Sequence, residues 1–192
     1  PKVAPKKISS KGREDLTGQP SLLFKSWESS NSPCLPALYS EPNEGGTRVW
    51  IHVPTVTERI NLGGKLDNYL KEKGEIICLG NNWLEFLNES LRLASQFNIN
   101  QKSEAISLIL DINNQGVVTE WKFILSIVNP VKLITPKHLT AISNRKLTSK
   151  SVPIALKGVK ENLEVIYNIL HSANLINNSN KLSIKLDENI PN

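Results

Sequence analysis

The chain has 192 residues, of which 39% are hydrophobic and 21% are charged, a composition typical of a globular protein with a sizeable core. No apolar run reaches the roughly 18 residues that a membrane-spanning helix needs, and no N-terminal segment has the pattern of a secretory signal. Two cysteines, Cys34 and Cys78, are too few for a disulfide framework and form no Cys-x-x-Cys pair. The composition therefore excludes a membrane protein and a disulfide-rich secreted protein, and it predicts a cytoplasmic one.

The positive charge of the chain is concentrated at its N-terminus. The net charge is +5, and residues 1–13 contain five cations and no acid, so residues 14–192 hold 18 cations and 18 acids. Because residues 1–13 carry few large apolar side chains, we expect a disordered basic arm that precedes a single domain over residues 14–190. Such an arm improves solubility or contacts phosphates. Its candidate phosphate contacts are Lys6, Lys7, Lys11 and Arg13.

The first half of the chain changes character at residue 48. Residues 14–47 are rich in Ser, Pro, Gly and Asn, and we expect no regular strand there. Three prolines would interrupt a backbone ladder in this segment: Pro33, Pro36 and Pro42. Alternating β-branched residues predict a strand over 48–53, and helical spacing predicts a helix over 65–73. A short strand is expected over 75–79, followed by a helix over 83–97.

A hairpin is the clearest prediction for the centre of the chain. Two apolar runs, 105–112 and 117–128, are joined by Asn113-Asn114-Gln115-Gly116, whose Asn and Gly residues tolerate positive φ. Pro130 closes the second run, and Pro136 is expected to begin a helix with Thr135 as its N-cap.

The last part of the chain predicts one more helix and one more strand. Val159, Leu163, Ile166, Leu170 and Ala173 form an apolar stripe at helical spacing, which predicts a helix over 159–173 that ends at the Asn-rich residues 174–180. Leu182, Ile184 and Leu186 alternate as a final strand. Together the elements predict an α+β fold, with a mostly antiparallel sheet and helices packed on one side.

A basic strip lies between Glu120 and Glu161, where there is no carboxylate. Its eight cations are Lys122, Lys132, Lys137, Arg145, Lys146, Lys150, Lys157 and Lys160. Acids elsewhere in the fold could balance this strip as an ordinary solvated face, or the strip could bind a polyanion such as a nucleic acid. On the second interpretation the candidate contacts are Lys132, Lys137, Arg145, Lys146 and Lys150.

Recognisable catalytic or metal-ligating motifs are missing. The three histidines, His52, His138 and His171, have no Cys, His or acid at ligand spacing, and His52 in mid-strand is expected to be packed rather than to bind a metal. The sequence contains no nucleophile elbow, phosphate-binding glycine loop or zinc-protease helix.

Several segments nevertheless occur in a familiar order. Arg13-Glu14-Asp15-Leu16-Thr17 comes first, and Ala37-Leu38-Tyr39 precedes the predicted strand Arg48–Val53. Gly64-Lys65-Leu66-Asp67 opens the next helix, and the hairpin over 111–128, the helix over 162–175 and the strand over 182–186 follow. In this order they resemble the first half of the catalytic domain of the ribonuclease II family of 3′-to-5′ exoribonucleases. The resemblance makes residues 13–17 the first strand of that domain. The resemblance covers about residues 13 to 190 and implies the fold of that domain. It also implies an activity that shortens RNA one nucleotide at a time with Mg²⁺ held by clustered aspartates.

The carboxylates that the resemblance requires are not present. In the family the aspartates come just before the alanine-leucine step, which corresponds to residues 24–36 here. That segment has no aspartate, its only acid is Glu28, and Lys25 stands where the first acid is expected. Asp15 is the only aspartate before Asp67, so no shift of register can supply a cluster. We therefore transfer no catalytic residue and expect neither a metal ion nor another cofactor.

These observations predict a catalytically inactive ribonuclease II-like domain that binds RNA, a protein partner or both. A first alternative is an interaction or scaffold subunit with no RNA role, because half of a family domain leaves apolar surface for a partner or a homo-oligomer. A second alternative is a component of an active 3′-to-5′ exoribonuclease that another chain completes.

Overall fold

The computed structural model of the chain describes residues 5–25, 36–75, 77–79, 82–84, 87–144 and 153–179. Seven strands form the main sheet: β1 (Glu14–Asp15), β2 (Leu22–Phe24), β3 (Ala37–Asn43), β4 (Gly46–Pro54), β7 (Ser103–Asn113), β8 (Val118–Val128) and β9 (Lys132–Ile134). Their order is β1-β8-β7-β4-β3-β2-β9, with β1 parallel to β8, β2 parallel to β9 and antiparallel pairing between the other neighbours.

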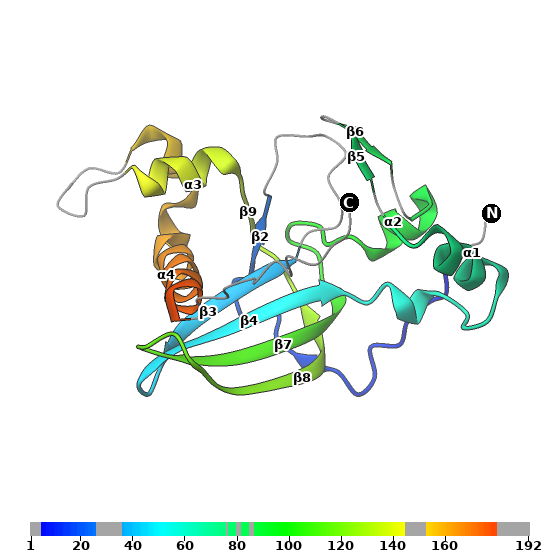
Figure 1. Ribbon diagram of the computed structural model, residues 1–192, viewed down its shortest axis with the longest axis horizontal. Coiled ribbons are helices and arrows are strands. Elements are labelled where there is room, and N and C mark those ends of the chain that lie inside the picture. The colour runs from blue at the N-terminus through cyan, green and yellow to red at the C-terminus, as the bar shows by residue number, and fades with distance from the viewer. Residues whose placement is uncertain are drawn as a thin grey trace, which may run out of the picture.

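The helices and a small second sheet complete the described chain. They are the 3₁₀ helix η1 (Thr57–Arg59), α1 (Lys65–Lys73), β5 (Ile77–Leu79) paired with β6 (Asn82–Leu84), α2 (Glu89–Ser95), α3 (Pro136–Ser143), the 3₁₀ helix η2 (Ile154–Asn162) and α4 (Leu163–Ser179). Figure 1 shows α3 and α4 at one end of the main sheet and α1 and α2 at the other. The predicted α+β class with a mostly antiparallel sheet is confirmed, because four of the six strand pairings are antiparallel and two are parallel. Within the described ranges, no helix has both the length and the apolar character needed to cross a bilayer.

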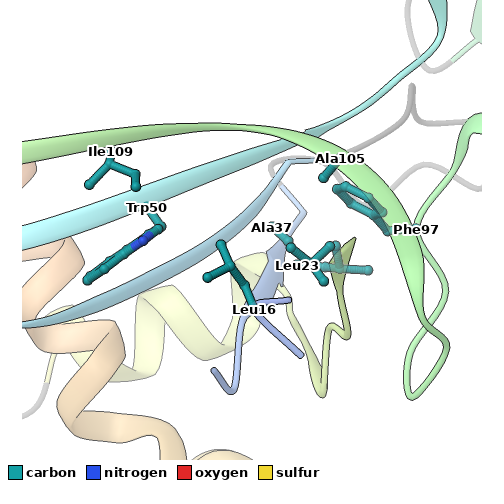
Figure 2. Close-up of a cluster of buried hydrophobic side chains, with 8 residues drawn as sticks. Leu16, Leu23, Ala37, Trp50, Phe97, Ala105 and Ile109 are labelled. Carbon is teal, nitrogen blue, oxygen red and sulfur yellow. The ribbon is translucent and has the colours of Figure 1, made fainter. Parts of the chain in front are cut away.

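The two faces of the sheet belong to two cores. Side chains alternate between faces along a strand, so Trp50 and its cross-strand neighbour Ile109 point to one side. That side carries a cluster of Leu16, Leu23, Ala37, Trp50, Phe97, Ala105, Ile109 and Val128 (Figure 2). The opposite face packs under α3, η2 and α4, with a cluster of Leu22, Ile134, Ile142, Leu156, Val159, Leu163 and Ile166.

The central hairpin forms as its turn residues predict. The Asn113 side chain accepts hydrogen bonds from the backbone N–H groups of Gln115 and Val117, both at 3.0 Å. Gly116 adopts a φ of 79°, which a residue with a Cβ rarely takes. Beyond this turn, β7 and β8 pair from Ile112 and Val118 to Ser103 and Val128, with one shift of register between Asp111 and Ile112, and form the longest ladder of the sheet.

The prediction that the prolines of residues 14–47 prevent regular strands is wrong, whereas the first strand that the family resemblance places at residues 13–17 is present as β1. The segment contributes β1, β2, the whole of β3 and the first two residues of β4. Pro42 lies within β3 opposite Thr47, while β2 pairs only with Ala37 and Leu38 of the same strand. Among the described strands Pro42 therefore has a neighbour on one side only, and a proline that donates no hydrogen bond is tolerated at such an edge.

The helix predicted over 83–97 is much shorter in the structure. Residues 82–84 pair with β5, and the helix begins only after Asn88, whose side-chain oxygen accepts a hydrogen bond from the backbone N–H of Leu91 at 2.9 Å. Leu91 then packs with Leu66 and Leu70 of α1 in a third cluster. An Asn N-cap therefore sets the start of this helix, a signal that the apolar spacing alone does not contain.

The last described helix extends beyond its predicted end. A 3₁₀ helix precedes α4, and α4 continues to Ser179 through the Asn-rich residues. The Ser179 hydroxyl donates to the carbonyl oxygen of Gly116 at 2.9 Å, so the end of α4 docks on the tip of the β7–β8 hairpin. This tertiary contact outweighs the weak helix propensity of asparagine. The strand predicted over 182–186 lies outside the described residues.

Candidate nucleic-acid interface

A hollow of about 470 Å³ lies between β9 and η2. Its lining residues are Pro20, Val131, Lys132, Lys157, Gly158, Lys160, Glu161 and Asn162. Three cations of the predicted basic strip therefore border one depression. Lys132 of β9 and Lys157 of η2 are 25 residues apart in sequence, and the packing of η2 against the sheet brings them together.

Each of these lysines is positioned by an apolar neighbour. Lys132 belongs to β9, which pairs with β2, and the next residue, Leu133, packs against the core of the other face. On η2, Leu156 and Val159 are buried beneath the helix, while Lys157 and Lys160 are exposed. Residues three apart eclipse one another along a 3₁₀ helix, so Lys157 and Lys160 share one side. Burial of the apolar pair thus orients the charged pair toward solvent.

The electrostatic character of the hollow is positive. Three lysines face one carboxylate, Glu161, among the lining residues. No ion pair within the described ranges involves any of these three lysines. The field of Lys132 also reaches α3: burial first and the charge of Lys132 second lower the pKa of His138. A concave surface with surplus positive charge attracts an anion such as a phosphate.

The other predicted contacts are in different places. Lys137 is exposed in the first turn of α3, whereas Arg145, Lys146 and Lys150 lie outside the described residues. Lys6, Lys7 and Lys11 are exposed on the N-terminal arm. The arm runs beside η1 and α1, away from α3 and α4 (Figure 1). The structure therefore does not bring the arm and the hollow into one surface.

The described part of the arm makes specific contacts, in contrast to the disordered arm expected from its composition. The backbone N–H of Lys6 donates to the carbonyl oxygen of Arg59 at 3.0 Å, and the Ser10 hydroxyl donates to Glu104 at 3.2 Å. Arg13 holds the C-terminal end of the arm in place, because its guanidinium donates to both carboxylate oxygens of Glu58 at 2.8 and 2.6 Å. Polar contacts thus hold a segment that has little apolar surface to bury.

Arg13 needs a correction as a candidate phosphate contact. Its side chain is only 2% exposed. Besides Glu58, it donates to the carbonyl oxygens of Ala105 at 3.3 Å and Ser9 at 3.0 Å. A buried guanidinium with these partners cannot reach a phosphate, so Arg13 is a structural residue.

The aspartates of the described chain lie in three separate places. The Asp15 carboxylate accepts from the backbone N–H of Thr17 at 2.9 Å, and Asp67 pairs with Lys71 at 2.7 Å. Asp111 accepts two hydrogen bonds from the Arg48 guanidinium, both at 2.6 Å. Hydrogen bonds lower the pKa of all three carboxyl groups: those from the side chain and then the backbone of Thr17 at Asp15, from Lys71 at Asp67 and from Arg48 at Asp111. Each aspartate is committed to its own partner.

The residues that the structure describes do not fit a magnesium centre of the kind the family resemblance implies. Mg²⁺ requires several oxygen ligands around one point. Nowhere in the described ranges do three His, Cys, Asp or Glu side chains gather closely enough to hold a metal. Lys25, at the position of the first expected acid, continues the pairing of β2 with β9 by donating its backbone N–H to Ile134 at 2.8 Å. Residues 26–35, which follow it, are outside the described chain.

His52 is a packed histidine, as its place in mid-strand predicts. It is fully buried, and its Nδ1 lies 2.6 Å from the Ser107 hydroxyl, which in turn lies 2.6 Å from the Ser126 hydroxyl. Burial lowers the pKa of His52 to about 4, so the imidazole is neutral at physiological pH. The chain of hydroxyls resembles a catalytic arrangement in composition only, because no substrate can reach a fully buried side chain.

Comparison with known proteins identifies the family. The family model of the RNB domain matches residues 13–190. This chain belongs to the RNB-domain family. The match confirms the resemblance drawn from the order of the sequence motifs, and it covers nearly the whole chain. A search of curated proteins finds no match.

Solved structures show the same fold. Mycoplasma genitalium RNase R in complex with double-stranded RNA aligns with a TM-score of 0.72 and 18% identity, covering 88% of this chain and 29% of that chain. Yeast Ssd1, a pseudonuclease, aligns with a TM-score of 0.64 and 17% identity, covering 87% of this chain and 21% of that chain. An active-site mutant of the Dss1 exoribonuclease from Candida glabrata aligns with a TM-score of 0.66 and 16% identity, covering 89% of this chain and 23% of that chain. This RNB-domain chain thus spans less than a third of the length of each of these relatives.

Proposed function

We propose that this RNB-domain chain binds RNA through the hollow between β9 and η2 and does not hydrolyse it. The observation that carries the proposal is the convergence of Lys132, Lys157 and Lys160 on one depression. Three ammonium groups around a concave surface suit the phosphates of a nucleic-acid backbone and read no sequence. RNase R of Mycoplasma genitalium, which shares the fold, is known in complexes with double-stranded and single-stranded RNA.

The absence of hydrolysis follows from the carboxylates. Phosphodiester hydrolysis by this family requires divalent metal, and metal requires clustered oxygen ligands. The described aspartates are dispersed over β1, α1 and β7, and the segment before the alanine-leucine step contains Lys25 and no aspartate. Yeast Ssd1, another structural relative, is described as a pseudonuclease. We therefore assign this chain a binding role that needs no metal or other cofactor.

Salt-dependent binding tests this proposal. The anisotropy of a labelled single-stranded RNA of about 16 nucleotides is measured at several salt concentrations. We expect binding that weakens steeply with salt, because each phosphate contact releases counterions and three contacts give a log–log slope of about −2 on single strands. Single Lys→Ala changes at Lys132, Lys157 and Lys160 should each reduce the slope by about one or less.

The matched control reverses lysines elsewhere on the surface. The triple variant K132E/K157E/K160E is expected to abolish binding, whereas K65E/K102E, with the exposed lysines of α1 and of the loop before β7, should bind as the wild type does. Equal loss in both variants would indicate attraction to net charge alone. Undiminished binding by the triple variant, or no binding by the wild type at about 50 mM salt, would reject the hollow as the RNA site.

A role in protein interaction is the second candidate, and a different surface supports it. Trp121, Phe123 and Leu125 of β8 are 65%, 61% and 46% exposed, and they lie on the same face of the strand. Exposed apolar groups of this size are typical of an interface. This candidate predicts a stoichiometric complex whose formation does not depend on RNA, so nuclease treatment should leave it intact.

A further inference from the structure

Strand β8 has a long free edge. Its neighbour β1 pairs only with Ser126 and Ile127, and no other described strand lies on that side of residues 118–125. The side chains from Val118 to Phe123 are all exposed, as expected beside an open edge. An edge with unpaired backbone N–H and C=O groups is a template for another strand.

The backbone direction of this edge follows from its pairing with β1. The N–H of Leu16 donates to the carbonyl oxygen of Ile127 at 2.9 Å, so the polar backbone groups of Ile127 point outward. Because these groups alternate along a strand, Leu125, Phe123 and Trp121 also present theirs to the free edge. The edge is therefore equipped to form an antiparallel ladder centred near Trp121.

The apolar face of the same segment has no cover within the described chain. The Trp121 and Phe123 rings contact each other edge to face, with centroids 5.7 Å apart. Their cross-strand neighbours on β7 are Leu110 and Leu108, both half-buried, and Ile106 opposite Leu125 continues the row. These residues carry no charge, so the face suits another apolar strand better than a phosphate backbone.

The opposite face of the edge carries one acid and one base. Glu120 and Lys122 are exposed, and neither forms an ion pair with another described residue. Glu120 lies directly across from Asp111, whose carboxylate is already bound by Arg48. Like charges opposite each other are unfavourable, so Glu120 would gain from a cation on its free side.

We propose that β8 pairs with β8 of a second copy of this chain, antiparallel and around a two-fold axis at Trp121. In this register Glu120 lies beside Lys122 of the partner subunit and Lys122 lies beside Glu120 of the partner subunit. Trp121 meets the partner's Trp121 on the apolar face. If the two-fold axis lay at residue 120 instead, two Glu120 side chains would lie opposite each other, and if it lay at residue 122, two Lys122 side chains would. Charge therefore selects the register centred on Trp121. The two seven-stranded sheets then become one continuous sheet.

The interface is independent of the RNA proposal. The hollow lies at β9, at the other end of the sheet order, so pairing through β8 leaves one hollow open on each subunit. The dimer would bind RNA at two places if the hollow is an RNA site. It would form equally well if the hollow binds nothing, so each proposal can fail without the other.

Charge reversal provides the test, with the 192-residue chain studied by sedimentation velocity over a range of concentrations. We expect a dimer for the wild type. E120K places two cations along the edge and K122E places two anions, so each alone should raise the dissociation constant at least tenfold. The double variant E120K/K122E restores opposite charges and should dimerise like the wild type. E44K, at the β3–β4 turn, is the control and should remain dimeric.

Mixing the two single variants makes the test decisive. An E120K chain and a K122E chain have complementary edges, so a mixture should form a heterodimer although each chain alone dimerises at least tenfold more weakly than the wild type. A wild type that stays monomeric at its highest soluble concentration overturns the proposal. So does a dimer that both single variants leave unchanged, because that dimer uses another surface. Dimerisation that appears only when residues 180–192 are deleted also overturns it, because those residues would then cover the edge.

Discussion

Arg13 and Glu58 form an ion pair in which only one partner is buried. The Arg13 side chain is 2% exposed and the Glu58 side chain 34% exposed, with a closest N–O distance of 2.6 Å. The pair ties the N-terminal arm to η1, which follows β4. Because desolvation falls mainly on the guanidinium, the two halves of the pair are not equivalent.

Removal of Glu58 is therefore expected to cost more than removal of Arg13. Glu58→Ala leaves a buried cation without its carboxylate and should lower the free energy of unfolding by about 3 kcal/mol. Arg13→Ala leaves a carboxylate that water can reach, so it should lower the free energy of unfolding by less than Glu58→Ala does. Urea unfolding of both variants, with Glu44→Ala as an exposed control, measures the difference. Equal losses for Glu58→Ala and Glu44→Ala would contradict this account.

The stability of the fold should fall as pH drops through the range in which His52 titrates. Burial lowers the pKa of His52 from 6.5 to about 4, so the unfolded chain binds a proton that the folded chain rejects. The stability that comes from burying His52 in its neutral form is fully present above pH 6.5 and is lost progressively toward pH 4. The loss from this residue is on the order of 3 kcal/mol.

A difference profile isolates this effect from that of the carboxylates. His52→Leu should flatten the dependence of unfolding free energy on pH between about 6.5 and 4. Parallel profiles for wild type and His52→Leu over this range would mean that His52 is protonated in the folded chain.

Two glycines with the same backbone conformation should differ in their tolerance of alanine. Gly45 and Gly116 have φ values of 80° and 79°, and each lies in a hairpin turn. A Cβ at Gly45 meets nothing, but a Cβ at Gly116 would collide with the backbone carbonyl of Leu175 in α4. Gly45→Ala should cost about 1–2 kcal/mol for positive φ alone. Gly116→Ala should cost about 1–3 kcal/mol more, because α4 must move.

Thermal unfolding of the two variants tests how closely α4 docks on the hairpin. The Ser179 contact indicates that α4 packs closely on the turn. If Gly116→Ala lowers the melting temperature no more than Gly45→Ala does, then this close packing is absent.

Magnesium should have no specific effect on this chain. The described residues hold no cluster of carboxylates. Millimolar Mg²⁺ is therefore expected to leave the melting temperature unchanged, since a ligand stabilises only the state that binds it. A labelled RNA should likewise keep its length on long incubation with Mg²⁺ and the protein. A saturable rise in melting temperature with Mg²⁺ but not with Na⁺ at equal ionic strength would indicate a metal site, and shortened RNA would indicate hydrolysis.

Local patterns in the sequence determine much of this fold. The helix Lys65–Lys73 and the β7–β8 hairpin occur where spacing and the Asn-Gly turn predict them, because both depend on residues close in the chain. The family also follows from the sequence, since the order of its motifs survives even where the acids are lost. The missing aspartates are likewise a property of the sequence: Asp15 alone precedes Asp67 in any structure.

Only the tertiary structure decides what depends on distant partners. The parallel pairing of β1 with β8 and of β2 with β9 joins segments more than 100 residues apart, which no local period encodes. The same holds for charge: Arg13 and Lys132 both count as cations in the sequence, yet folding buries the first against Glu58 and leaves the second beside Lys157 and Lys160. The sequence fixes the identity of each side chain. Its burial and its neighbours, which decide what a charge can bind, come from packing.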